Sequence, residues 1–187
     1  MLFRTVSIIA LLLCFLFGFS CSSEREDSSS KFDDLYQFKE VDLRAFDLPA
    51  TIFIPDETAG IGASFKTTVE HEEDFKWTIS AGPNFELFIE DWGDHAKRLE
   101  EFKLKLQQSN VFTSTIIEHK ENYILYKRQL TDPIKVKEYQ HISYHIYALI
   151  PINGVYYEVR NKTQGDPLKT AQLMITSIKS LKPCRTK

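Results

Sequence analysis

Two short segments carry the residue types that bind metal ions. Residues 70–74 read Glu-His-Glu-Glu-Asp, and His141 and His145 have a spacing that binds zinc when it lies on a helix. The histidine segment alternates as a strand instead, and four residues along a strand cover about 13 Å, whereas each ligand of one zinc lies about 2 Å from it. We expect residues 70–74 to be a solvated strand edge, and we expect no metal and no cofactor.

A pair of carboxylates offers a second kind of chemistry. Glu90 and Asp91 stand at the end of an expected strand and could serve in hydrolysis. No pattern nominates an acid or a nucleophile to work with them, and the sequence has no G-x-S-x-G motif. A small hydrolase or metal-binding enzyme built on these carboxylates is therefore the alternative to a domain without catalysis.

Cys21 is the residue whose chemistry is best defined by its surroundings. It follows an uncharged, mostly apolar run over residues 6–19, and Arg4 is the one charge before that run. The run is shorter than the roughly 20 apolar residues that span a bilayer, and it fits the h-region of a secretory signal. We expect residues 1–20 to be a signal peptide and the chain to be cut before Cys21 and exported.

The segment that ends at Cys21 resembles the lipobox of bacterial lipoproteins, in which the first mature cysteine receives a lipid. Ser20 fits the small-residue position, while Gly18 and Phe19 depart from the usual residues. The resemblance implies acylation of Cys21, for example by palmitate, and an outer membrane lipoprotein of the cell envelope with the membrane as its partner. Ordinary secretion is the alternative, because Gly18 and Ser20 also satisfy the small-x-small cleavage rule.

Composition divides the mature chain into a tether and a domain. Residues 21–34 hold five serines and five acidic residues with almost nothing apolar, so they cannot build a core. Residues 35–184 have the size of a single domain. The net charge of −3 comes with no basic block, so nothing indicates a nucleic-acid partner. Cys184 has no thiol to pair with once Cys21 is acylated, and we expect it to be incidental.

Hydrophobic periodicity predicts an α+β domain, an antiparallel sheet with helices packed on it. One helix is expected over residues 94–109 with Asp94 as its cap, and Asp166-Pro167 is expected to open a second helix with Asp166 as its cap. The expected apolar stripes are His95, Leu99, Phe102 and Leu106 in the first, and Leu168, Ala171, Ile175, Ile178 and Leu181 in the second. The expected strands are residues 50–54, 75–79, 85–89, 113–118, 123–130, 139–152 and 155–162.

Asn153-Gly154 predicts the final hairpin, because both central positions of a type I′ turn need a positive φ. A two-residue turn fixes the register and buries a face that includes Ile146, Ala148, Ile150, Val155, Tyr157 and Val159. The other face carries Tyr147, Tyr156, Glu158 and Arg160, with Tyr147 opposite Arg160. Tyrosine and arginine are enriched at interfaces, so this face is a candidate contact surface for a partner. The alternative is that the first helix covers it.

The order of these elements resembles the PsbP-like α/β/α sandwich over about residues 40–182. The residues behind the resemblance are Leu48-Pro49 leading into residues 52–55, the hairpin at Asn153-Gly154, and the closing residues 175–181. Members of that family mostly act as binding or assembly factors. The resemblance implies a non-catalytic binding or accessory module whose partner is an unknown envelope protein or small ligand. The alternative is a small envelope hydrolase using Glu90 and Asp91.

Overall fold

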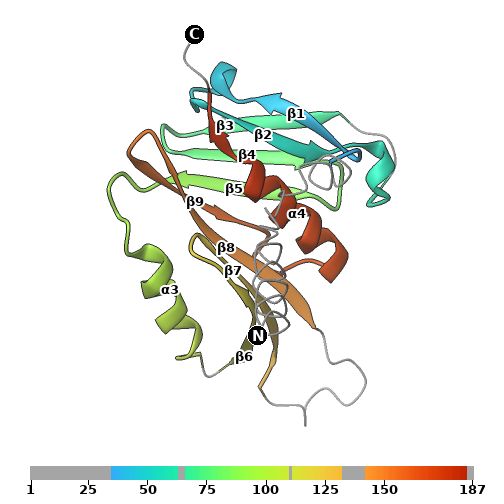
Figure 1. Ribbon diagram of the computed structural model, residues 1–187. Coiled ribbons are helices and arrows are strands. Elements are labelled where there is room, and N and C mark those ends of the chain that lie inside the picture. Colours follow the sequence, from blue (N-terminus) through green and yellow to red (C-terminus); the bar gives the residue numbers. More distant parts are fainter. Residues whose placement is uncertain (1–34, 63–65, 110, 132–141, 185–187) are drawn as a thin grey trace, which may run out of the picture. The chain divides into compact units, whose positions relative to one another are not determined.

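Seven antiparallel strands form the main sheet of the computed structural model, which describes residues 35–62, 66–109, 111–131 and 142–184. Their spatial order is β3-β4-β5-β9-β8-β7-β6 (Figure 1). The bounds are β3 Thr67–Glu72, β4 Lys76–Ala81, β5 Glu86–Asp91, β6 Phe112–His119, β7 Tyr123–Leu130, β8 Ser143–Ile152 and β9 Val155–Arg160. Residues 1–34 lie outside the described residues, and with them the expected signal peptide, Cys21 and the expected tether; His141 lies outside them too.

A second, three-stranded antiparallel sheet holds β2 in its centre. The order is β1-β2-β10, with bounds β1 Phe38–Asp42, β2 Ala50–Pro55 and β10 Lys182–Pro183. Two short 3₁₀ helices, η1 Arg44–Phe46 and η2 Glu57–Ala59, flank β2 along the chain. The fold is α+β, as predicted, but it has two sheets where the sequence suggested one.

Within the described ranges, two α-helices pack on the large sheet. Helix α4, Leu168–Ser180, packs against β2 and β8, and its buried residues join the main core with the inner side chains of both sheets. Helix α3, Arg98–Leu106, packs against β8, where Leu99 joins a smaller core with Ile124, Tyr126, Tyr147 and Leu149. Figure 1 shows α3 and α4 well apart on the sheet.

The final hairpin has the predicted turn and register. Asn153 has a φ of 52° and Gly154 a φ of 86°. Ile152 pairs with Val155 and Tyr147 with Arg160, as the two-residue turn requires. The predicted apolar face is buried except at Val155, which is half-buried.

Both helices begin later than predicted, and neither aspartate is the cap. Helix α3 begins at Arg98, because the backbone before it pairs with β9: the Trp92 N–H donates to the Tyr156 carbonyl and the Tyr156 N–H to Gly93. His95 therefore lies outside the helix. Asp166 pairs through its backbone with Tyr144, so Pro167 takes the N-cap position of α4.

Strands β1, β3 and β10 were not predicted from the sequence. β1 and β3 carry charged residues and are at best half-buried, so they lack the apolar alternation of a core strand. β10 has two residues and pairs with β2. Leu168 was expected in the buried stripe of α4, but it is 37% exposed at the first turn of that helix.

Candidate functional site

The face predicted as a contact surface lies largely beneath α3. Tyr147 and Glu158 are each 3% exposed, Tyr156 is half-buried, and only Arg160 is exposed. The Phe102 ring of α3 stacks on the Tyr147 ring with 3.8 Å between centroids. The alternative that a helix covers this face therefore holds for Tyr147 and Glu158, and the four residues do not form an open patch.

Glu158 is the centre of a buried ionic network. Its Oε2 accepts from Nε of Arg98 at 2.9 Å and from the Tyr147 hydroxyl, and its Oε1 lies 2.9 Å from Nε of Arg160. Arg160 also donates to the Glu90 carboxylate, with 3.3 Å between its Nη2 and Oε2 of Glu90. A buried carboxylate is costly unless it is paired, and two guanidinium groups and a hydroxyl supply its partners here.

Aromatic rings complete the surroundings of this carboxylate. The Arg98 guanidinium carbon lies 3.3 Å from the centre of the Trp92 ring, close enough for a cation–π contact. Burial raises the pKa of Tyr147, and the hydrogen bond to the Glu158 carboxylate raises it further. The phenol thus stays protonated and donates at neutral pH. The network joins α3 to the sheet and fixes the position of the helix.

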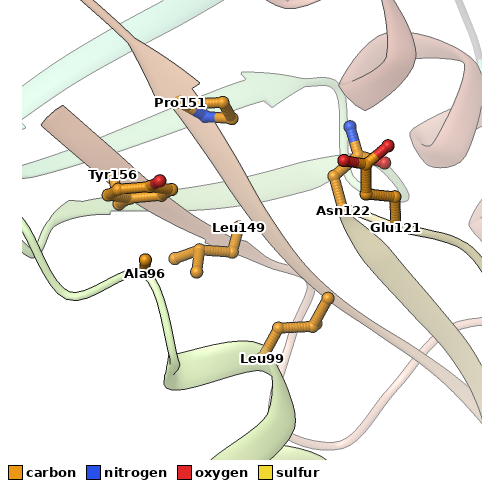
Figure 2. A pocket seen from close by; sticks show the side chains of 7 residues that line it. All are labelled: Ala96, Leu99, Glu121, Asn122, Leu149, Pro151 and Tyr156. Carbon is orange, nitrogen blue, oxygen red and sulfur yellow. The ribbon is translucent and has the colours of Figure 1, made fainter. Parts of the chain in front are cut away.

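A hollow of about 420 Å³ lies beside this network, between the start of α3 and the ends of three strands. That volume falls in the range of ligand pockets, about 300–1,000 Å³. Figure 2 shows Glu121 and Asn122 together at one end of it, and Tyr156 and Pro151 toward the other. The lining residues are Ala96, Leu99, Glu121, Asn122, Leu149, Pro151 and Tyr156.

The walls of this hollow are set by backbone pairing. The Leu149 N–H donates to the Asn122 carbonyl at 2.8 Å, which holds the β6–β7 turn against β8. The pairing of Trp92 and Gly93 with Tyr156 holds the opposite wall, where Ala96 follows. The hollow thus combines an apolar floor with an amide and a carboxylate at one end. No pattern in the sequence marked Glu121 and Asn122 as site residues, because the other residues that line the hollow are distant along the chain.

Glu90 and Asp91 do not face a common space. Glu90 pairs with Arg160, while Asp91 accepts from the Gly93 N–H at 2.7 Å and so stabilises the turn after β5. Neither residue lines the hollow. Both carboxylates are thus engaged in holding the structure together.

Ser143 and His145 form a buried pair, which the spacing of His145 and His141 did not indicate. The Ser143 Oγ lies 2.8 Å from Nε2 of His145, and both side chains are buried. Burial lowers the pKa of His145 to about 4, and the charge of Arg128 acts in the same direction. A Cβ on Gly165 would lie 2.6 Å from Nε2, so there is no room beside the ring for a substrate. The two side chains therefore fill space in the protein interior.

Among the described residues, no group of three or more histidine, cysteine or acidic side chains is placed to hold a metal ion. Residues 70–72 lie on the edge strand β3, where the His71 ring stacks on Trp77 with centroids 4.7 Å apart. Cys184 is half-buried with its N–H bonded to the Pro49 carbonyl. No helix within the described ranges is long and apolar enough to cross a membrane.

Comparison with known protein families, curated protein sequences and solved structures gave no match. The geometry of the hollow and the sequence around Cys21 are therefore the grounds for a proposal on function.

Proposed function

We propose that this chain is an exported, lipid-anchored lipoprotein of the cell envelope, whose domain acts as a non-catalytic binding or accessory module. The observation that carries the binding role is the hollow beside α3. It has the size of a ligand pocket, and its lining includes neither a nucleophile with a base nor a set of metal ligands. The PsbP-like resemblance favours the same kind of role.

The proposal of a lipid anchor is based on the position of Cys21. The residue ends an apolar run, follows the small Ser20 and precedes an acidic, serine-rich tether. Several acyl chains would hold the domain firmly at the outer membrane, whereas a single chain anchors only marginally. The tether of residues 21–34 would reach at most about 50 Å, enough to clear the lipid headgroups.

The lining of the hollow indicates the kind of group it accepts. Leu99, Leu149 and Pro151 offer apolar contact, and the Asn122 amide can both donate and accept at one end. This combination suits a small amphipathic ligand or an apolar side chain presented by an envelope protein. Apolar area supplies affinity in such pockets, and the few polar groups orient the ligand.

The test of the anchor is metabolic labelling with a fatty acid. The Cys21→Ser variant should lose the label and be released from membranes, while Cys184→Ser should keep both properties. A Cys21→Ser variant that remains acylated and membrane-bound would show that the lipoprotein assignment is wrong.

The test of the hollow uses the neutral fluorescent probe N-phenyl-1-naphthylamine. Binding should saturate, and Ala96→Trp should remove it, because the added ring fills the hollow from an exposed position. Lys97→Trp is the matched control, since Lys97 is the next residue and does not line the hollow. Equal binding by both variants, or no binding by the unaltered chain, would contradict a ligand site here.

A further inference from the structure

Strand β6 is an edge of the seven-stranded sheet, and in the described part of the chain it pairs with β7 alone (Figure 1). Residues 112–117 read Phe-Thr-Ser-Thr-Ile-Ile and contain no charge. Thr113, Thr115, Ile116 and Ile117 are exposed. Such an edge presents backbone N–H and C=O groups to another strand, beside side chains that favour strands. Among the described residues, the Phe112 N–H at its start donates to Oγ of Ser109 at 3.2 Å.

The opposite edge of the sheet is built differently. Strand β3 carries Glu70, His71 and Glu72 in its second half, and charged side chains on an edge oppose pairing with another strand. Strand β6 has its first charge at Glu118, after a bulge between Ile116 and Glu118. The five residues before the bulge therefore have regular strand geometry, and none of them carries a charge that would oppose pairing with another strand.

We propose that the β6 edges of two copies of this chain pair antiparallel about a two-fold axis, which gives one continuous sheet through the dimer. Faces must match across such a pair, so residues of like parity lie opposite each other. A two-fold axis through Ser114 places Phe112 opposite Ile116 and Thr113 opposite Thr115. Aromatic–β-branched and Thr–Thr pairs are both stabilising combinations in antiparallel sheets.

A second copy is the occupant because the segment complements itself in this register. The two-fold axis generates each pair twice. Two Phe112–Ile116 pairs therefore lie on the face that carries α3, and two Thr113–Thr115 pairs lie on the other face. No charged residue of either copy lies between Phe112 and Ile117. An isologous contact of this kind closes at a dimer and leaves β3 as the outer edge on both sides.

The test is sedimentation velocity at protein concentrations up to about 0.5 mM, since a contact of one short strand is weak. The chain of residues 21–187 carries Cys21→Ser, and a reductant excludes a disulfide through Cys184. We expect a monomer–dimer equilibrium. In a T113E/T115E double variant, each pair would place two glutamates opposite each other, and the dissociation constant should rise about tenfold or more.

A T113K/T115E double variant is the matched control. It differs only at position 113, and it would place a lysine opposite a glutamate in both pairs, so the dimer should persist. Thr115 lies opposite Lys127 within the chain, so a glutamate there is compatible with folding in both variants. Thr68→Glu on the β3 edge should also leave the dimer intact. A monomer at every concentration, or equal dimerisation of the two double variants, would overturn the proposal.

Discussion

The Phe102 ring of α3 lies parallel to the Tyr147 ring of β8, with centroids 3.8 Å apart and 6° between their planes. With this stacking, α3 covers the face of the sheet that carries Glu158. The Tyr147 hydroxyl donates a hydrogen bond to the Glu158 carboxylate. Arg98, four residues before Phe102 and thus on the same side of the helix, binds the same carboxylate. Helix α3 is therefore held by an aromatic contact and an ionic one together.

Glu158→Gln should lower the free energy of unfolding by about 3 kcal/mol, because it leaves Arg98 without its counter-charge in a mostly buried position. Glu90→Gln is the control. Glu90 pairs with the exposed Arg160 at 3.3 Å, and such a pair contributes about 1 kcal/mol or less. Urea unfolding measures both, and equal losses would mean that Glu158 does not hold α3.

Local signals were enough to predict the β8–β9 hairpin, whereas long-range partners decided the burial of Glu158. The Asn153-Gly154 turn fixes its register within the hairpin itself. Glu158 is neutralised by Arg98, which lies 60 residues away, and no local pattern shows that pairing. The hollow was missed for the same reason: Ala96, Asn122 and Leu149 come from three separate segments. The free edge at β6 likewise follows from strand order rather than from the sequence of that strand.

Gly154→Val should destabilise the domain by about 1–3 kcal/mol, because Gly154 has a φ of 86° and a β-branched residue resists that conformation. Gly154→Asn should be milder, since asparagine tolerates positive φ better. Thermal unfolding of the two variants compares them directly. The prediction fails if valine and asparagine have equal effects.

Ile150→Ala should cost about 2–5 kcal/mol, since Ile150 is 4% exposed on the core face of the hairpin. Leu104→Ala on α3 is the comparison, because Leu104 is 60% exposed and its truncation should change stability by less than about 0.5 kcal/mol. Denaturant titration gives both values. Similar small losses would place Ile150 outside the core.

Acidification should destabilise the domain through His145. Burial lowers its folded pKa to about 4 from an ordinary value of 6.5, so the unfolded chain binds the proton more tightly. The stability that His145 contributes is present above pH 6.5 and is lost as the pH falls toward 4, by about 3 kcal/mol in all. Asp166 acts in the opposite direction, because burial raises its pKa.

The measurement is therefore a difference between variants across pH. The gap in unfolding free energy between the unaltered chain and His145→Gln should narrow between pH 6.5 and 4. A gap that stays constant across this range would contradict the lowered pKa of the buried His145 imidazole.

Gly165 and Gly93 allow the cost of crowding His145 to be separated from the cost of backbone strain. Both have positive φ, 76° for Gly165 and 59° for Gly93, so alanine at either should cost about 1–2 kcal/mol for the backbone. A Cβ at Gly165 would also lie 2.6 Å from His145 Nε2 and 2.7 Å from Ser143 Cβ, while a Cβ at Gly93 meets nothing within 4 Å. Gly165→Ala should therefore cost about 1–3 kcal/mol more than Gly93→Ala, because overpacking forces buried groups apart. Chemical denaturation of the two variants gives the difference. Its size reports how rigidly the Ser143–His145 pair is held, and equal losses would show that the pair yields freely to an added methyl group.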